Sequence, residues 1–196
     1  MESHKVQGVL DFPIGLTGVH CLEARLIGHS NFNGFALYLQ SLRYGRPTRP
    51  EDPRSMLAEL CGTCSSKHRL LASVAHESNH PEVRLTIGIY LMSDRNTPGV
   101  GPVLRSSGLE SIPEAHCFLT VAQRRFDFTG LPPGSSSPLD DLIEEHFVAP
   151  AELPQKKPYI HLRAIAQWSE RQGMSADAAW SIREECIKAL AAPAGA

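Results

Sequence analysis

Apolar residues recur at helical spacing along much of the chain. After the small residues at 62–66, the run from Leu70 to Ala75 keeps this spacing until Ser-Asn-His-Pro at 78–81, which predicts a helix over 64–77. The N-terminal part, 5–27, shows no sustained period, so we expect irregular structure there with one short strand or helix. The same spacing predicts further helices over 33–44, 55–60, 139–147, 159–171 and 176–190, the last with Ser175 as its N-cap.

Two segments carry the pattern of β structure instead. Residues 83–92 (VRLTIGIYLM) are β-branched or apolar at most positions, which is typical of a strand covered on both faces. Residues 116–121 and 124–129 alternate and predict a hairpin through Ala122-Gln123, with Val121 opposite Arg124. This register gathers apolar side chains on one face, namely those of Cys117, Leu119, Val121, Phe126 and Phe128.

The composition limits the classes of function. A net charge of −2 over 196 residues argues against a nucleic-acid or anionic-membrane surface, because such binding relies on basic patches. No apolar run approaches the roughly 18 residues that span a bilayer, and the first residues lack the apolar region of a signal peptide, so we expect a cytoplasmic protein. The five cysteines are an odd number at irregular spacing and favour reduced thiols over a disulfide framework.

Gly62-Thr63-Cys64 places a cysteine at the start of the predicted 64–77 helix. Unpaired backbone N–H groups and the positive end of the helix dipole stabilise a thiolate there, which makes Cys64 a candidate nucleophile. In the predicted hairpin, His116 and Asp127 share a face as diagonal neighbours, about 7–8 Å apart between Cα atoms. Such a nucleophile requires an imidazole that moves the proton and a carboxylate that orients the imidazole.

Three blocks of the sequence resemble the transglutaminase-like core of the papain-like superfamily: Gly62-Thr63-Cys64, His116-Cys117-Phe118-Leu119 and Phe126-Asp127-Phe128-Thr129. The resemblance covers about residues 30–131 and implies an α+β fold in which the Cys-bearing helix packs on a small antiparallel sheet. It also implies Cys64 as the nucleophile, His116 as the general acid/base and Asp127 as its orienting carboxylate. Two positions depart from the family, since Phe118 stands where Trp is usual and Phe128 where Pro is common.

By this resemblance the chain is expected to be a cysteine-dependent acyl-transfer enzyme that acts on an amide or peptide bond through a thioester, with hydrolysis favoured over cross-linking. No side-chain oxyanion donor stands just before Cys64, so the candidates are the backbone N–H of Cys64 and the amides of Asn33 and Gln40. No cofactor or metal is expected. The alternative from another class is a catalytically silent module of the same fold that binds a peptide.

The expected organisation is a catalytic core over 1–137 with a helical N-terminal part, helices over 138–191 that pack on the core, and a disordered tail at 192–196. Within it, 93–108 is predicted to be a loop long enough to be functional, and the Pro- and Gly-rich run at 131–134 is predicted to be a break.

Two further motifs offer alternative chemistry. His76-Glu77-Ser78-Asn79-His80 matches the His-Glu-x-x-His motif of zinc peptidases, but Pro81 and the polar residues before it place His80 beyond the end of the predicted helix. Cys61 and Cys64 form a Cys-x-x-Cys pair, which suits a redox pair, half of a zinc site, or a disulfide that protects Cys64.

Overall fold

The structure, a computed structural model, describes residues 8–130 and 137–191. Its helices are α2 (Val19–Leu26), α3 (Phe32–Ser41), α4 (Pro53–Glu59), α5 (Cys64–Glu77), α6 (Gly101–Ser106), α7 (Leu153–Gln172) and α8 (Ala176–Ala191), with 3-10 turns η1 (Gly8–Leu10), η2 (Pro138–Asp141) and η3 (Pro150–Glu152). Its strands are β1 (Arg43–Tyr44), β2 (Cys61–Gly62), β3 (Arg84–Met92), β4 (Ile112–Val121), β5 (Arg124–Phe126) and β6 (Leu142–Val148). Helix and strand are therefore mixed, as expected. The predicted break at 131–134 and tail at 192–196 lie outside the described residues.

The chain divides into two compact units. The first unit contains 1–86, 117–130 and 147–153, and the second contains 87–116, 131–146 and 154–196. Three of the boundaries fall inside β3, β4 and β6, and each unit is assembled from segments that are far apart in the sequence.

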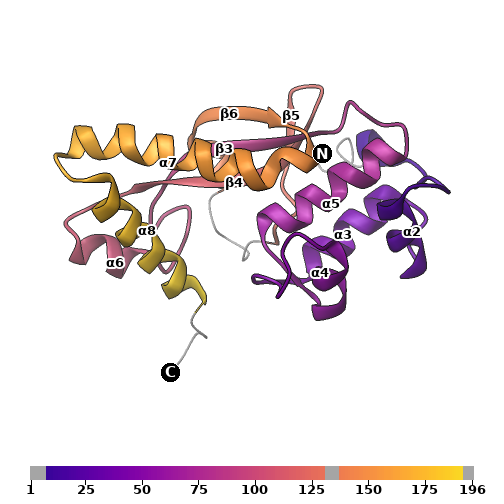
Figure 1. Cartoon of the computed structure of the whole chain (residues 1–196), viewed down its shortest axis with the longest axis horizontal. Helices are drawn as coiled ribbons and strands as arrows, with labels where there is room; N and C mark the ends of the chain where they lie inside the picture. The colour runs from indigo at the N-terminus through magenta and orange to yellow at the C-terminus, as the bar shows by residue number, and fades with distance from the viewer. Residues whose placement is uncertain (1–7, 131–136, 192–196) are drawn as a thin grey trace. The chain divides into compact units, whose positions relative to one another are not determined.

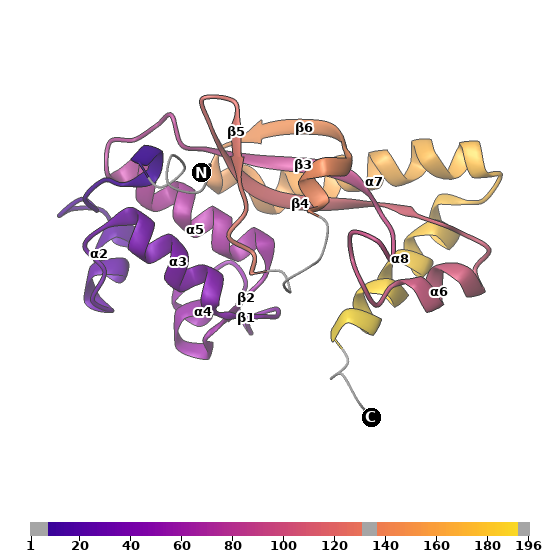
Figure 2. The same ribbon diagram turned by 180° about the vertical axis from the view of Figure 1, so that it is seen from behind.

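Helix α5 is the framework of the first unit. Helices α2, α3 and α4 pack against it, and both ribbon views show them beside it (Figure 1; Figure 2). The apolar stripe Leu70, Leu71 and Val74 is buried, together with Phe35 and Leu39 of α3. Burial of this stripe stabilises a helix whose first turns carry polar residues. The bounds of α5 confirm the helix predicted over 64–77.

Four of the other predicted helices are confirmed, and one of them, α7, is longer than predicted. α3, α4, α7 and α8 occupy the segments predicted around 33–44, 55–60, 159–171 and 176–190. α7 starts earlier than predicted, at Leu153, because Pro158 lies inside the helix instead of preceding it. Ser175 caps α8 as predicted, since its Oγ accepts a hydrogen bond from the N–H of Ala178 at 3.2 Å. In the segment 5–27, the described residues contain η1 and α2.

Strands β5, β4, β3 and β6 form a four-stranded sheet in that order. β4 and β5 pair antiparallel, and Val121 lies opposite Arg124 while Leu119 lies opposite Phe126, which confirms the predicted register. Ala122 and Gln123 form the two-residue turn with φ values of 46° and 63°. Both are left-handed, as the tight hairpin turn that matches the twist of the strands requires. A separate pair, β1 and β2, is parallel.

The helix predicted over 139–147 is wrong, because this segment contains η2 and strand β6. Along β6 the partly buried Leu142, Glu144 and His146 alternate with exposed neighbours, which is a period of two. The spacing of apolar residues at the start of this segment resembled that of a helix. The segment instead pairs with the edge of the sheet at β3, where its backbone hydrogen bonds are made as β structure. The predicted loop at 93–108 contains the short helix α6. The Asp94 carboxylate accepts hydrogen bonds from the N–H groups of Gly99 and of Gly101, the first residue of this helix.

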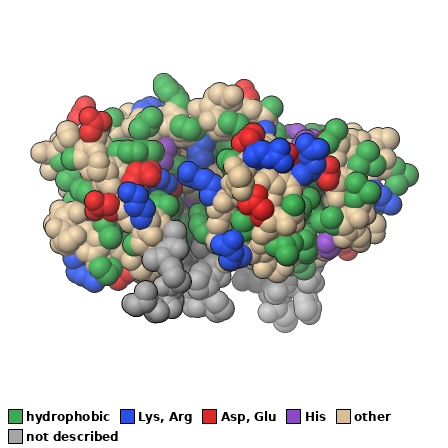
Figure 3. Space-filling view, turned by 60° about the horizontal axis from the view of Figure 1, so that its bottom comes forward, with side chains coloured by type: hydrophobic (Ala, Val, Ile, Leu, Met, Phe, Trp, Pro, Cys, Tyr) green, Lys and Arg blue, Asp and Glu red, His purple; other side chains and the backbone are tan. Residues whose placement is uncertain are grey.

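The second unit has its own apolar core, to which α6 and α8 contribute side by side. Its buried members are Tyr90, Met92, Val100, Leu104, Ile112, Ile165, Ala179 and Cys186. No helix in the described part of the chain is both long and apolar enough to cross a membrane. On the face drawn in Figure 3, Lys and Arg side chains are interspersed with Asp and Glu side chains.

Candidate active site

Cys64 is the first residue of α5, directly after its N-cap. The Oγ1 of Thr63 accepts a hydrogen bond from the N–H of Ser66 at 3.3 Å, and the Oγ of Ser66 accepts from the N–H of Thr63 at 2.9 Å. This reciprocal capping box fixes the turn in which the cysteine stands. The N–H of Cys64 itself is among the first four of the helix, which have no carbonyl partner within it.

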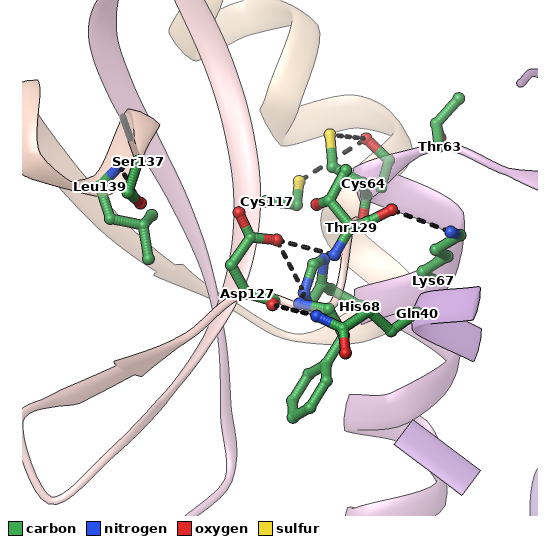
Figure 4. A network of polar contacts seen from close by, with 12 residues as sticks. Gln40, Thr63, Cys64, Lys67, His68, Cys117, Asp127, Thr129, Ser137 and Leu139 are labelled. Carbon is green, nitrogen blue, oxygen red and sulfur yellow. Dashed lines mark hydrogen bonds and ion pairs between the residues drawn. The ribbon is translucent and has the colours of Figure 1, made fainter. Parts of the chain in front are cut away.

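The thiol of Cys64 lies in a small cluster of polar sulfur and oxygen atoms. Its Sγ is 3.9 Å from the Oγ of Ser65, and that Oγ is 3.6 Å from the Sγ of Cys117 on β4 (Figure 4). Cys64 is 5% exposed and Cys117 is fully buried. All five cysteines of the chain are free thiols, so Cys61 forms no disulfide with Cys64 in this structure.

Asp127 follows strand β5 directly and is held by its own turn. Its Oδ1 accepts a hydrogen bond from the N–H of Thr129 at 2.8 Å. The amide of Gln40, at the C-terminal end of α3, approaches the carbonyl oxygen of Asp127 at 3.5 Å. In Figure 4 one carboxylate oxygen turns toward Thr129 and the other turns away from it. The side chain of Asp127 is 13% exposed, so the carboxylate is partly open to solvent or to a neighbouring group.

A buried imidazole connects the two ends of this network. Nδ1 of His68 lies 2.8 Å from the carbonyl oxygen of Cys64, and Nε2 accepts a hydrogen bond from the N–H of Phe128 at 2.8 Å. The same Nε2 is 3.6 Å from the Oδ1 of Asp127. The first turn of α5 and the segment after β5 are therefore joined through one side chain, as Figure 4 shows.

Lys67, the residue before His68, is also fully buried. Its Nζ donates hydrogen bonds to the carbonyl oxygens of Leu42 at 2.7 Å and Thr129 at 2.9 Å. Burial lowers the pKa of this ammonium group from 10.5 to about 8, against the opposing influence of Asp127 and the thiols of Cys61 and Cys64. When protonated, Lys67 places a positive charge within the site, in surroundings that screen it poorly.

The predicted site residues fall in three places. Cys64 and Asp127 belong to the first unit and are linked through the His68 network, whereas His116 belongs to the second. His116 is buried on β4, with its ring edge-on to that of Tyr90 at a centroid separation of 6.3 Å. Of the two amide candidates, Gln40 lies at this site. Asn33 lies at the other end of α3, two helical turns earlier.

The His-Glu-x-x-His motif does not adopt the geometry that zinc binding needs. α5 ends at Glu77, and Asn79 has a φ of 63°, so the two histidines are not on successive turns of one helix. His80 instead stacks on Phe12 with ring centroids 3.7 Å apart, and the Oε1 of Glu77 lies 2.6 Å from the Nδ1 of His20. Within 8–130 and 137–191 there is no group of three or more His, Cys, Asp and Glu residues suited to a metal ion.

Sequence reasoning missed the parts played by Lys67 and His68. A signal was present, because both positions lie on the face of the predicted helix that also carries Cys64 and Leu71. Two consecutive polar residues on a face that packs into the protein must find partners there. Those partners are backbone groups from distant segments, which a pattern of residue types does not specify.

The chain was also compared with known proteins. No protein-family model matches it, and neither the curated proteins nor the solved structures include a match.

Proposed function

We propose that this protein is a cysteine-dependent acyl-transfer enzyme in which Cys64 attacks the carbonyl carbon of an amide. The observation that carries the proposal is the hydrogen-bonded connection, through His68, between the helix turn that bears Cys64 and the segment that bears Asp127. A nucleophile at a helix start and a carboxylate anchored on the same framework are two of the three groups that such a mechanism needs.

In the proposed reaction, the Cys64 thiol loses its proton to the imidazole of His116 and its sulfur bonds to the carbonyl carbon. The tetrahedral intermediate then collapses, the carbon–nitrogen bond breaks, and the imidazolium protonates the departing amine. Water attacks the resulting thioester, with the imidazole taking its proton, and the thiol is restored as the carboxylic acid leaves. Asp127 orients the imidazole and stabilises its charged form.

The turn before α5 supports this chemistry electrostatically. The positive end of the helix dipole stabilises a thiolate at Cys64, and the backbone N–H of Cys64 is a candidate donor to the oxyanion. The amide of Gln40 is the nearer of the two side-chain candidates, because it already reaches the carbonyl of Asp127. The charge of protonated Lys67 adds to the positive potential in this region.

The finer assignment is a papain-like core of the transglutaminase-like type. The order of the Cys helix, the His strand and the Asp segment along the chain supports it. We propose hydrolysis of an amide or peptide bond over cross-linking, and a cytoplasmic setting in which the thiols stay reduced.

Alkylation of Cys64 by iodoacetamide tests the proposal without a known substrate. The rate is followed by mass spectrometry of the Cys64 peptide at pH 6, where an ordinary thiol with a pKa of about 8.5 is almost fully protonated. We expect Cys64 to react at least about tenfold faster than a free thiol, and His116→Ala to remove most of that advantage. His76→Ala is the matched control, because His76 is an exposed histidine near the other end of α5.

The proposal fails if Cys64 reacts no faster than a free thiol and if His116→Ala leaves the rate unchanged. That outcome would favour the silent peptide-binding module.

A further inference from the structure

Two consecutive side chains of α5 hold the backbone of the segment that carries Asp127. His68 accepts a hydrogen bond from the N–H of Phe128 at 2.8 Å, and Lys67 donates one to the carbonyl of Thr129 at 2.9 Å. Neither side chain has exposed surface. Because both contacts are made to the two residues that directly follow Asp127, they fix the position of the backbone from which its carboxylate extends.

The imidazole of His68 bridges two backbone groups. The N–H of Phe128 can only donate, so Nε2 presents its lone pair and the ring hydrogen is on Nδ1. Nδ1 then donates to the carbonyl oxygen of Cys64, 2.8 Å away. The ring therefore joins the residue of the proposed nucleophile to the segment of Asp127, and neither nitrogen is left to take a proton from a substrate.

Asp127 lies beside this ring at a distance longer than that of a hydrogen bond. Its Oδ1 is 3.6 Å from Nε2, but Nε2 offers a lone pair at that point and not a hydrogen. The Oδ1 instead accepts the N–H of Thr129 at 2.8 Å. The backbone turn at Thr129 therefore holds the carboxylate of Asp127, and the side chains of His68 and Lys67 hold that turn in place.

We propose that His68 is a positioning residue, which keeps Asp127 at a fixed place relative to Cys64 by accepting the N–H of Phe128 from its position on α5, with its ring oriented by the carbonyl of Cys64. The inference rests on the acyl-transfer function proposed above. Lys67 makes the second contact to the same segment. A misplacement of about 1 Å can cost on the order of 100-fold in rate. Loss of the contacts of His68 should therefore displace Asp127 and thereby lower the reactivity of Cys64.

Three variants separate the two halves of the bridge. In His68→Gln the side-chain amide reaches the position of Nε2, and its oxygen can accept the N–H of Phe128. In His68→Asn the shorter side-chain amide reaches only the position of Nδ1, so it can keep the contact to the carbonyl of Cys64 but not the contact to Phe128. His68→Leu removes both. With iodoacetamide at pH 6, we expect Gln to keep the wild-type rate of Cys64 alkylation within about threefold, and Asn and Leu to lose about tenfold or more.

A merely structural role makes a different prediction. If His68 acts through Asp127, His68→Asn combined with Asp127→Asn reacts at the rate of Asp127→Asn alone, within about twofold. Equal losses for Gln and Asn, or losses that multiply in the double variant, would overturn the positioning role. Thermal unfolding of each variant accompanies the rates, and if Leu does not fold, the comparison of Gln with Asn still decides.

The proposed function and this inference fail in different ways. If His116→Ala and Asp127→Asn leave the alkylation rate of Cys64 unchanged, the acyl-transfer proposal is wrong and no positioning of Asp127 exists to be tested. If both variants lower the rate but His68→Asn reacts like the wild type, only the role of His68 is wrong.

Discussion

Lys67 donates a hydrogen bond from its Nζ to the carbonyl oxygen of Thr129, 2.9 Å away, from a side chain with no exposed surface. A second bond, to the carbonyl of Leu42, ties the same ammonium group to the residue after α3. A lysine in this position costs desolvation free energy when charged, and its lowered pKa of about 8 records that cost. A neutral amine keeps two N–H donors, so both bonds survive deprotonation.

The first prediction concerns the stability of Lys67→Met at different pH. Because the folded pKa of about 8 lies below the unfolded value of 10.5, the unfolded chain holds more protons between these values, and the wild type gains stability as the pH rises through this window. Methionine cannot titrate. We therefore expect the free energy of unfolding of the wild type relative to the variant to rise by on the order of 1–3 kcal/mol from pH 7 to pH 10.5.

Urea unfolding of the wild type, Lys67→Met and Lys67→Leu at both pH values measures this difference. The two apolar variants lack the titrating group alike, so they should show the same trend against the wild type. A difference that stays constant or shrinks with rising pH would contradict the buried, desolvated ammonium group.

Local patterns predicted two features of the first unit, helix α5 and the pairing of the β4–β5 hairpin. The bounds of α5 and the register of Val121 opposite Arg124 both followed from apolar spacing, even though Ala122-Gln123 is a weak turn sequence. The register was fixed by the separation of apolar and polar faces, since a slip of one residue would turn every apolar side chain the wrong way. The separation of the two faces therefore outweighed the weak turn preference of Ala122 and Gln123.

Other features depend on partners that are distant in the sequence. β6 is a strand because β3 offers it a sheet edge, which no pattern within 139–148 reveals. The roles of Lys67 and His68 likewise depend on carbonyl and N–H groups at Thr129 and Phe128. Residue types on one helix face predict that partners exist, but only the fold supplies them.

The second prediction concerns the turn of the β4–β5 hairpin. Gln123 has a φ of 63°, which is strained for a residue with a Cβ and ordinary for glycine. Gln123→Gly should therefore raise the free energy of unfolding by about 0.5–1 kcal/mol, the relief of strain outweighing the added flexibility of the unfolded chain. Gln123→Val, with a β-branched side chain, should lower it. Thermal unfolding of both variants measures this, and destabilisation by glycine would show that the turn is not left-handed.

The third prediction concerns Gly130, which follows the segment held by Lys67. Its φ is +79°, and a Cβ there would collide with the carbonyl oxygen of Gln40. Gly130→Ala must therefore push the chain away from α3 and draw Thr129 from the Nζ of Lys67. We expect a loss of unfolding free energy of about 2 kcal/mol or more, together with slower alkylation of Cys64.

Gly28→Ala is the matched control for that experiment. Gly28 has a similar φ of +92°, but a Cβ there would meet nothing within 4 Å. It should show only the cost of the left-handed backbone, about 1–2 kcal/mol, and leave the alkylation of Cys64 unchanged. Equal effects of the two variants would mean that the contact between Gly130 and Gln40 carries no weight.

The last prediction concerns a buried ion pair in the second unit. The guanidinium of Arg183 on α8 donates from Nη2 to Oε1 of Glu114 at 2.7 Å and from Nε to Oε2 at 2.5 Å, with side chains that are 13% and 10% exposed. Burial alone raises the pKa of Glu114, but the hydrogen bonds from Arg183 and the nearby charges more than offset this, so its pKa lies below the ordinary value. Arg183→Leu leaves that carboxylate buried without its main partner.

We expect Arg183→Leu to lower the free energy of unfolding at pH 7 by about 3–5 kcal/mol, and Arg183→Leu with Glu114→Leu to recover much of that loss. In the single variant, burial raises the pKa of Glu114 above its unfolded value, so protonation stabilises the folded state as the pH falls. In the wild type, acid removes the stability that the low pKa of Glu114 provides. Guanidinium unfolding at pH 7 and pH 4 measures the difference in unfolding free energy between the wild type and Arg183→Leu. We expect this difference to be smaller at pH 4. A larger difference at pH 4 would mean that Arg183 does not hold Glu114 in its charged form.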